Sequence, residues 1–402
     1  MRIALARYRY SPHGGAERYL DGLGERLREA GADVRILSSS WEGAEKTVSS
    51  WERIRVPKWP ASFRPLLFAQ AVGRWARAHP EWLLFSWERL PGAEVVRAGD
   101  GCHAEWLMRK RALKAPHAAA LDRLRPLNRT HIGLERQMFQ SGKLLAVIAN
   151  SARGKEEIVR HYGVPEENVS VVHNGVDLSR FPAAKREEAR GKLRGRFAVS
   201  GDETVFLFVG SGFARKGVGA LTDAAIALAR TGRRFRILVV GKGDPRPYMN
   251  RAAASGAGSA LRFLGPVSGA EEFYLGSDAF VFPTVYEPFS NACLEAMAAG
   301  LPVITTETNG VTEIFGDGDA GFVLADPFDV PALAGRMGEL LDPALRMRMG
   351  TAAREAAERV PLEKKVGEIL GVLSRAWEKK TGKPSGQAAL PGGEKTWETG
   401  SC

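Results

Sequence analysis

Cysteine is scarce in this sequence of 402 residues, and long apolar runs are missing. The three cysteines, Cys102, Cys293 and Cys402, show neither a CxxC pair nor a metal-ligand spacing, which argues against a disulfide framework and against a zinc site. No stretch approaches the roughly 18 apolar residues that cross a bilayer. The apolar run after Met1 is too short for a signal peptide, so we expect a cytoplasmic protein with reduced thiols.

Positive charge is concentrated in the first half of the chain. Residues 1–180 contain 29 Lys and Arg against 20 Asp and Glu, whereas the remainder contains 28 against 26. This asymmetry predicts an anionic partner for the first half, which could be nucleic acid, a membrane surface or an anionic acceptor. The sequence has no zinc-finger, RRM or KH pattern, so we expect no nucleic-acid partner.

Strands and helices alternate along most of the chain, which predicts an α/β fold with parallel sheets. A charged stretch around residue 185 separates two series of strands, so we expect two domains, 1–184 and 185–361. A helix over 362–379 follows, and the composition of residues 380–402 is typical of a disordered tail. The predicted strands are 2–6, 33–38, 82–86, 95–98, 144–149, 169–173, 204–209, 235–240, 261–264, 279–283 and 302–306.

Two carboxylates, Glu287 and Glu295, flank the most informative segment of the chain. An apolar strand precedes Glu287, and an Ala- and Leu-rich helix follows it and stops at Gly300. Ser290 is suited to be the N-cap of this helix, whose free N–H groups and positive dipole end then form an anion site between the carboxylates. A ligand with a phosphate at this site and hydroxyl-rich groups beside both carboxylates is a nucleotide sugar, so the segment predicts a nucleotide-sugar site. The alternative is a solvated loop and an ordinary surface helix.

A glycine-rich loop over residues 210–217 follows a predicted strand and opens a helix. Its glycines allow the backbone to approach a phosphate, and Arg215 and Lys216 supply cations. The loop is neither a Walker A motif nor a strict GxGxxG, so by itself it could equally be a plain strand–turn–helix. A DxD pair, Asp317 and Asp319, lies in another Gly-rich segment, which we interpret as a turn and not as a metal site.

Three shorter loops could also face a ligand. Gly14 and Gly15 allow a sharp turn after the first strand, and Gly241 and Val267 lie at the ends of two later strands. Each of these loops could equally be a structural turn.

A basic segment from Arg109 to Arg129 follows Trp106 in the first half of the chain. It contains seven Lys and Arg against one acid, Asp122, with apolar residues at near-helical spacing. This pattern is typical of an interfacial segment attracted to anionic lipid, and the phosphates of an acceptor would attract the same residues. A basic solvated helix that packs its leucines on the core is an equally good interpretation.

The tract from Glu287 to Glu295 resembles the E-x7-E signature of the retaining GT-B glycosyltransferases of family four, and Arg215-Lys-Gly217 is similar to their Arg-Lys-Gly element. This resemblance implies a GT-B fold, in which two Rossmann-like domains face each other across a cleft and a C-terminal helix crosses back to the first domain. We expect no metal or other cofactor, because no cluster of His, Asp and Glu argues for one, and Arg215, Lys216 and the helix N-terminus can supply the positive charge. Many members carry an Arg just after the first glycine of the loop, where this chain has Ser211.

By position, the resemblance implies roles for individual residues. Glu295 would hold the ribose, Glu287 would lie against the donor sugar, and Phe289, Ser290 and Asn291 would take the diphosphate. Arg215 and Lys216 would neutralise the leaving diphosphate. Gly14 and Gly15 would contact the phosphate of the donor, and Gly241 and Val267 would flank the nucleotide base.

The segments 97–106, 130–139 and 210–217 are similar to one subgroup of this family, the glucosyltransferases that add a hexose to heptose in the lipopolysaccharide core. The similarity implies a UDP-sugar donor, a heptose acceptor on lipid A–core, and peripheral attachment to the inner face of the inner membrane. It makes Asp100 a candidate catalytic residue and His103 and His131 candidates for positioning the acceptor. The alternatives are another polysaccharide or glycolipid acceptor, or a UDP-sugar epimerase of the same fold.

Overall fold

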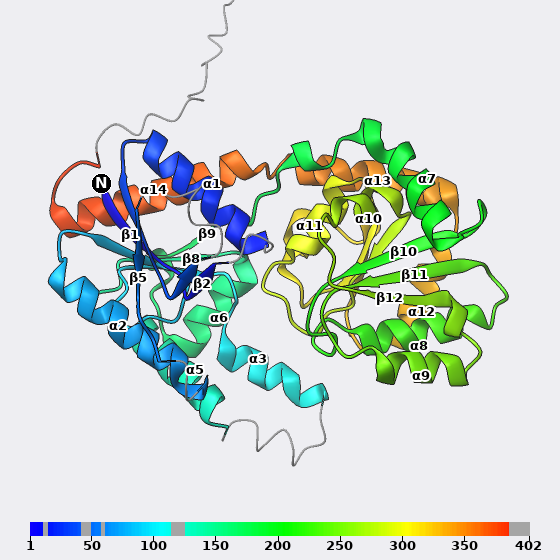
Figure 1. Ribbon diagram of the computed structural model, residues 1–402, viewed down its shortest axis with the longest axis horizontal. Helices are drawn as coiled ribbons and strands as arrows, with labels where there is room; N and C mark the ends of the chain where they lie inside the picture. The colour runs from blue at the N-terminus through cyan, green and yellow to red at the C-terminus, as the bar shows by residue number, and fades with distance from the viewer. Residues whose placement is uncertain (11–14, 42–49, 58–60, 114–124, 386–402) are drawn as a thin grey trace, which may run out of the picture.

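The computed structural model describes residues 1–10, 15–41, 50–57, 61–113 and 125–385, which form two α/β domains (Figure 1). The first domain is built on a seven-stranded parallel sheet with the order β5-β3-β1-β6-β7-β8-β9. A separate two-stranded ribbon pairs β2 with β4. The elements of this domain are β1 (Arg2–Ala6), β2 (Arg9–Tyr10), α1 (Gly15–Glu29), β3 (Asp33–Ser38), β4 (Ser40–Trp41), β5 (Trp51–Arg53), α2 (Arg64–Ala78), β6 (Leu83–Ser86), β7 (Val95–Ala98), α3 (His103–Arg109), α5 (Pro126–Phe139), β8 (Ala146–Ala149), α6 (Ala152–Tyr162) and β9 (Val169–Val171).

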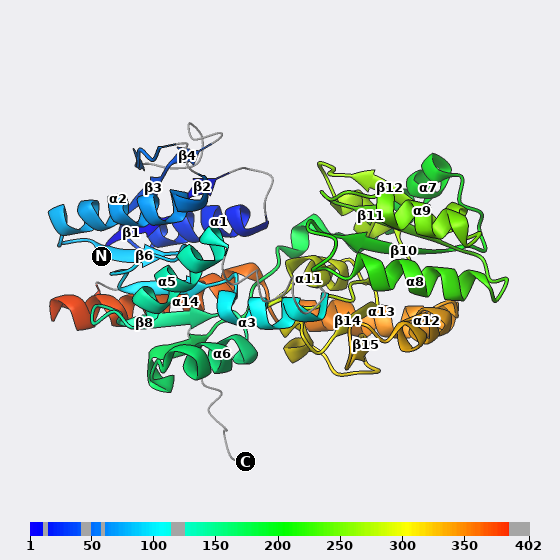
Figure 2. The same cartoon turned by 90° about the horizontal axis from the view of Figure 1, so that it is seen from below.

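Both faces of the first sheet are buried because helices cover them (Figure 2). Successive residues of a strand point to opposite faces, so Ile3 and Leu5 of β1 join the core under α1, while Ala4 and Ala6 join the core under α2, α5 and α6. Leu20, Leu23 and Leu27 of α1 are fully buried in the first of these cores.

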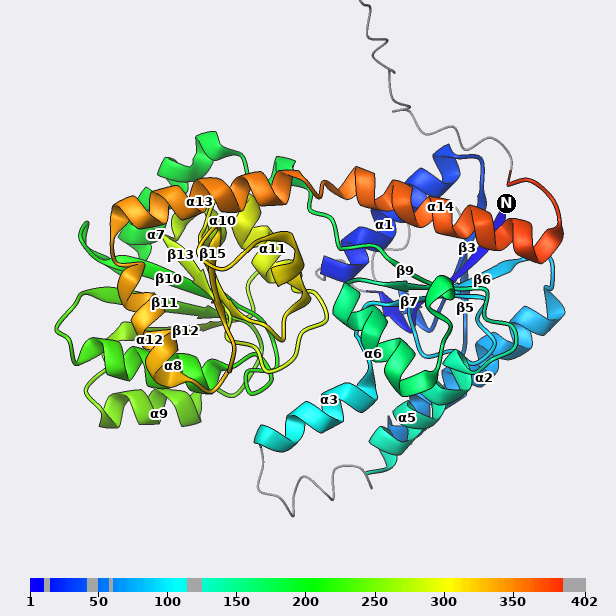
Figure 3. The ribbon, with the colours of Figure 1, turned by 180° about the vertical axis from the view of Figure 1, so that it is seen from behind.

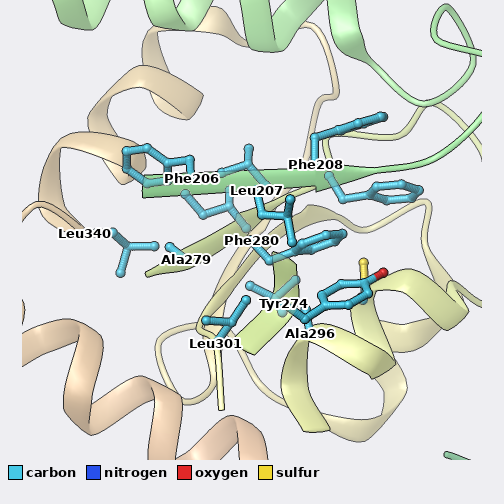
Figure 4. Close-up of a cluster of buried hydrophobic side chains, with 14 of the residues drawn as sticks. Phe206, Leu207, Phe208, Tyr274, Ala279, Phe280, Ala296, Leu301 and Leu340 are labelled. Atoms are coloured by element: carbon cyan, nitrogen blue, oxygen red, sulfur yellow. The ribbon is translucent and has the colours of Figure 1, made fainter. Parts of the chain in front are cut away.

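The second domain contains a six-stranded parallel sheet with the order β12-β11-β10-β13-β14-β15. Aromatic rings fill its core, where Phe280 lies 5.8 Å from Tyr274 and 5.9 Å from Phe282 between ring centres (Figure 4). The elements of this part of the chain are α7 (Arg186–Phe197), β10 (Thr204–Val209), α8 (Val218–Ala229), β11 (Phe235–Val240), α9 (Arg246–Ala254), β12 (Leu261–Gly265), α10 (Glu271–Gly276), β13 (Ala279–Val281), α11 (Asn291–Ala298), β14 (Val303–Thr306), β15 (Gly321–Leu324), α12 (Val330–Glu339), α13 (Pro343–Glu358) and α14 (Leu362–Thr381).

The last helix, α14, leaves the second domain and packs on the first (Figure 3). Val366, Ile369 and Leu373 on its apolar face share a core with β1 and α1. The chain therefore crosses between the domains twice, and the two crossings are hydrogen-bonded to each other: the N–H of Val176 donates to the carbonyl of Val360 at 3.1 Å. A Cβ on Gly175 would lie 2.6 Å from the Cα of Leu362, so this close approach needs glycine.

The chain after β14 forms a 3-10 helix, Gly310–Ile314, and then the last strand of the sheet. Strand β15 was not predicted, because its four residues begin with a glycine and lack a distinct apolar period. Its backbone pairs with β14 from Val303 to Thr306, which completes the edge of the sheet.

We predict that Leu373→Ala destabilises the protein, because Leu373 is fully buried where α14 covers the first sheet. A leucine truncated to alanine in such a core lowers the free energy of unfolding by about 2–5 kcal/mol. Urea denaturation measures the loss. The matched control is Met347→Ala, since Met347 is 75% exposed and its truncation is expected to stay within about 0.5 kcal/mol. Equal losses in the two variants would contradict the packing described for α14.

Candidate active site

A cavity of about 490 Å³ lies between the two domains. The carboxyl ends of the parallel strands of both sheets contribute to its walls, which is where α/β sheets bind ligands. Nine of the predicted site residues line it: Asp100, Lys216, Gly241, Val267, Glu287, Phe289, Ser290, Asn291 and Glu295. Gly15 is the first residue of α1, and Gly14 lies outside the described residues.

The floor of the cavity is the N-terminus of α11. The hydroxyl of Ser290 caps this helix by accepting from the N–H of Cys293 at 3.2 Å, as predicted. Two groups at the first turn, the N–H of Asn291 and of Ala292, have no carbonyl available within the helix. With the positive end of the helix dipole, they form a site for an anion beside Glu287.

Two cations stand next to this anion site. The ammonium of Lys216 contacts the carboxylate of Glu287 and lies 4.9 Å from the ring centre of Phe282. The guanidinium of Arg215 is 3.7 Å from the same carboxylate. Gly217 follows at φ 79°, and a Cβ there would lie 1.8 Å from the carbonyl oxygen of Pro283, so only glycine permits the loop to bring both cations to this place.

Arg180 is a site residue that sequence reasoning missed. It lies between the two domains and reaches the carboxylate of Glu295 at 3.0 Å and that of Glu271 at 2.6 Å. Charge-assisted contacts of this kind fix the orientation of a carboxylate. No local motif could have revealed Arg180, because its two partners lie 91 and 115 residues further along the chain.

The opposite wall of the cavity comes from the first domain. Asp100 follows β7, and the neighbouring Gly101 adopts φ 67° where a Cβ would lie 2.3 Å from the hydroxyl oxygen of Tyr286. A second link crosses the cavity nearby: Arg97 donates to Asn174 at 2.7 Å, and Asn174 donates to the side chain of Asn291 at 2.7 Å. The first domain thus contacts the residue that opens α11.

Two carboxylates hold the domains together behind the cavity. The buried hydroxyl of Tyr286 donates to Glu157 at 2.6 Å and accepts from the N–H of Cys102 at 3.2 Å. Glu313 accepts from the N–H groups of Ala152 and Arg153 at the start of α6, at 2.8 and 3.1 Å. Burial raises the pKa of Glu157 to about 7.

The two candidate histidines lie outside the lining of the cavity. His103 and His131 are 5.0 Å apart between ring centres, and the Nε2 of His103 is 3.1 Å from the side-chain oxygen of Asn128. Burial, helped by the nearby charge of Arg89, lowers the pKa of His131 to about 4 and lowers that of His103 in the same way. Both rings are therefore neutral at pH 7 and pack α3 against α5.

Glu135, close to these histidines, has a structural role. Its carboxylate accepts from the N–H of His103 at 2.9 Å and from Arg89 at 3.0 Å, and it also contacts the hydroxyl of Tyr162. The side chain is almost fully buried. These contacts tie α3, α5 and α6 into one unit behind Asp100.

The predicted basic segment is described only at its two ends, because residues 114–124 lie outside the described part of the chain. Of the flanking elements, α3 extends away from the first domain, and α5 lies beside α2 (Figure 1). The solvent-exposed side chains in and next to these helices include the basic Arg111, Arg125 and Arg129, and the apolar Met108 and Leu127, which are 46% and 41% exposed.

Within the described residues, no helix is long and apolar enough to span a membrane. The same residues contain no group of three or more His, Cys, Asp or Glu side chains that could hold a metal ion. Asp317 accepts from the N–H of Val323 at 2.9 Å, and Gly318 between the two aspartates has φ 85°, so the DxD pair forms a turn.

Comparisons with known proteins assign both halves of the chain to glycosyltransferase families. The family described as "Glycosyltransferase Family 4" matches residues 13–180, and the family described as "Glycosyl transferases group 1" matches residues 189–356. The lipopolysaccharide glucosyltransferase WaaG of Escherichia coli K12 is 27% identical over 362 residues, which is 89% of this chain and 94% of the relative. A glycogen synthase of Mycobacterium tuberculosis is 28% identical over 88% of this chain and 90% of its own length.

Solved structures agree with these matches. The crystal structure of WaaG, a glycosyltransferase involved in lipopolysaccharide biosynthesis, superposes with a TM-score of 0.80 and 25% identity over 95% of this chain and 100% of its own. Anabaena HepE in complex with UDP and glucose superposes with a TM-score of 0.68 and 19% identity over 93% of this chain and all of its own, which shows a shared fold.

We predict that Glu157 makes stability depend on pH. The folded protein holds the proton up to a pKa of about 7, whereas an unfolded chain releases it near the ordinary value of 4.5. The stability from this group is therefore fully present below pH 4.5 and is lost as pH rises through 7. Between pH 5 and pH 8 the free energy of unfolding should fall on the order of 2–3 kcal/mol more in the wild type than in Glu157→Gln.

Urea denaturation of both proteins at the two pH values measures this difference. Glu156→Gln is the matched control, because Glu156 is the preceding residue of α6 and is exposed. It should follow the wild type at both pH values. A Glu157→Gln variant that loses as much stability as the wild type between pH 5 and pH 8 would contradict the assignment.

Proposed function

The chain belongs to family four of the GT-B glycosyltransferases, and from this premise we propose that it transfers a hexose from a UDP-sugar to a heptose of the lipopolysaccharide inner core, with retention of the anomeric configuration. One observation carries the proposal. A single cavity between the domains brings an anion site at the start of α11, two carboxylates and a cation together opposite Asp100. Glucose is the first candidate for the sugar, because the similar E. coli enzyme is named as a glucosyltransferase; GlcNAc and galactose are the others.

The donor is proposed to lie along the second-domain wall of the cavity. The N–H groups at the start of α11 donate hydrogen bonds to its diphosphate. Phe289, Ser290 and Asn291 form the rim of this phosphate site. Glu295 accepts from the ribose hydroxyls, with Arg180 holding the carboxylate in place. The base lies between the loops of Gly241 and Val267, and the hexose lies against Glu287.

The proposed chemistry breaks the bond between the sugar C1 and the phosphate oxygen while the acceptor oxygen bonds to C1 from the same face. Negative charge grows on the leaving UDP, and fixed positive groups that face it lower the barrier. Lys216, Arg215 and the N-terminus of α11 supply these groups. The departing phosphate accepts the proton of the acceptor hydroxyl, so we propose that no protein base, metal or other cofactor takes part.

The acceptor is proposed to enter along the first-domain wall, where Asp100 can accept a hydrogen bond from a sugar hydroxyl. His103 and His131 would act only through the loop that carries Asp100, since they pack behind it. A heptose acceptor is supported by the likeness to the E. coli enzyme over nearly its whole length. The similar identity to a glycogen synthase keeps another polysaccharide or glycolipid acceptor as the second candidate.

We further propose that the protein works at the inner face of the inner membrane as a peripheral protein. The support is the basic segment from Arg109 to Arg129, whose described ends carry exposed arginines and the exposed Leu127, with the exposed Met108 directly before it. Basic side chains near the surface attract anionic lipid, and apolar side chains enter the headgroup region. A membrane position also suits an acceptor that carries lipid A.

Transfer assays with a panel of labelled UDP-sugars test the proposal. Purified protein is mixed with heptose-terminated lipid A–core in the presence of EDTA, and the glycosidic linkage of the product is determined. We expect product from one donor, with the α configuration of the UDP-sugar retained. Transfer to a glucan and not to the core would favour the second candidate. UDP-sugar consumption without any glycoside would favour an epimerase, and a requirement for added metal would contradict the metal-free mechanism.

We predict that Lys216→Ala lowers kcat by about 10²–10³, because one preorganised donor to the departing charge is lost. Initial rates of sugar transfer measure the change. Lys192→Ala is the matched control, since Lys192 lies in the same domain, is 60% exposed and pairs only with Glu188 among the contacts of the described residues. It should keep wild-type activity. Near-normal turnover in Lys216→Ala would contradict the proposed role of this residue.

A further inference from the structure

Three polar side chains form a hydrogen-bonded chain across the cavity between the domains. Arg97 lies on β7 of the first domain, Asn174 follows β9 where the chain crosses between the domains, and Asn291 is the first residue of α11. All three line the cavity. Nη2 of Arg97 donates to Oδ1 of Asn174 at 2.7 Å, and Nδ2 of Asn174 donates to Oδ1 of Asn291 at 2.7 Å. An arginine of the first domain therefore acts, through one asparagine, on a side chain at the anion site.

The arginine fixes the direction of both hydrogen bonds. A guanidinium has only donors, so the group of Asn174 that faces Arg97 must be its oxygen. The NH2 of Asn174 then faces Asn291 and only donates, so Asn291 presents its own oxygen in return. The NH2 of Asn291 remains, and among the described residues it has no hydrogen-bond partner.

The guanidinium of Arg97 is held in place by the first domain. The side chain is buried, and the guanidinium lies 5.4 Å from the ring centre of Trp87. The backbone of Arg97 belongs to the parallel ladder of β7 with β8, where it is in register with Ile148. The start of the hydrogen-bonded chain is therefore fixed by the central part of the sheet.

The backbone that carries Asn174 is held by the residues on both sides. The preceding His173 stacks on Phe289 at 5.4 Å between ring centres, and its Nε2 is 2.8 Å from the carboxylate of Glu313. The following residue is the glycine that packs against the second crossing of the chain. Since these neighbours all dock on other segments, the position of Asn174 opposite Asn291 is set before a ligand binds.

This orientation matters for a phosphate bound beside α11. Asn291 opens that helix, whose free N–H groups and positive dipole end form the anion site. An amide that turned its oxygen to the phosphate would place partial negative charge against an anion, whereas an amide that turns its NH2 supplies one more donor. The chain of hydrogen bonds from Arg97 selects the second arrangement.

We infer that Arg97 and Asn174 are positioning residues that orient the amide of Asn291, so that its NH2 donates to the diphosphate of the donor. The inference rests on the proposed function, because it takes the ligand at the start of α11 to be the diphosphate of a UDP-sugar. It adds a side-chain donor to the backbone N–H groups of this site. It also makes that donor depend on the first domain, since the amide is oriented only while Asn174 stays in contact with α11.

The variant Asn174→Asp tests the orientation with almost no change of shape. The new carboxylate still accepts from Arg97 but does not donate to Asn291, so the amide of Asn291 should turn its oxygen toward the phosphate. We expect the affinity for UDP, measured by calorimetry, to fall about tenfold or more, because a donor to a charged group is lost. The affinity for uridine, which has no phosphate, should stay the same in an NMR titration. A general distortion of the site would weaken the binding of both ligands.

Two further variants separate the orientation of the amide from simple charge repulsion. Asn168→Asp is the matched control, since Asn168 lies directly before β9, does not line the cavity and has no side-chain hydrogen bond among the described residues. It should bind UDP as the wild type does. Direct repulsion of the phosphate by the new carboxylate is measured in the Asn291→Ala background. If Asn174→Asp acts through the amide of Asn291, the double variant should bind UDP as Asn291→Ala alone does.

Three results would overturn the inference: wild-type affinity of Asn174→Asp for UDP, equal losses for UDP and uridine, or a tenfold further loss when Asn174→Asp is added to Asn291→Ala. The wild-type protein distinguishes this failure from that of the proposed function. A wild type that does not bind UDP removes the proposed donor and the inference together. A wild type that binds UDP and transfers sugar, with unchanged UDP affinity in Asn174→Asp, removes the inference alone.

Discussion

The side-chain amide of Asn309 is the interaction on which the candidate site depends. It is completely buried, accepts from the N–H of Ser290 at 3.1 Å and donates to the hydroxyl of Thr305 at 2.9 Å. The backbone of Glu287 is fixed on both sides nearby, since its N–H donates to Thr308 and its carbonyl accepts from Gly310. A buried polar group without its partners is costly, so these bonds specify one conformation of the loop that presents both the carboxylate and the start of α11.

The same loops also carry contacts between the domains. Tyr286 precedes Glu287 and reaches Glu157, and Asn291 opens α11 and accepts from Asn174. Gly310 follows Asn309 and approaches the first domain so closely that a Cβ would lie 2.7 Å from that of Ser151. The residues proposed to bind the donor are therefore neighbours of those that set the position of the acceptor wall. A shift of the loop on donor binding would act directly on the contact between the domains, because only a few residues of chain separate the donor-binding residues from those that make this contact.

Local sequence patterns were sufficient for many of the elements and for the Ser290 cap. Apolar runs gave β1, β3, β7, β10 and β11 with their observed bounds, and Ser290 caps α11 as expected, whereas β2, β4, β5 and β15 were not predicted. Contacts between residues that are far apart in the sequence left no pattern in the local sequence. Asn309 looked like an ordinary loop residue, and neither the pair of Arg180 with Glu295 nor that of Tyr286 with Glu157 has a spacing that a motif could encode. Burial and pairing across domains decide these cases, and neither can be read from a local window of sequence.

The excess positive charge of the first half of the chain is divided among several separate places in the structure. Some arginines are neutralised within the domain, as Arg89 is by Glu135 and Arg109 by Glu105. Arg9, Arg53, Arg55 and Arg64 line a cavity of the first domain, and further arginines lie at the ends of the segment that is proposed to meet the membrane. A single diffuse positive surface would attract any polyanion. Two separate basic regions would instead favour a ligand with negative charge at two places, which is what the proposed lipid-linked acceptor would present.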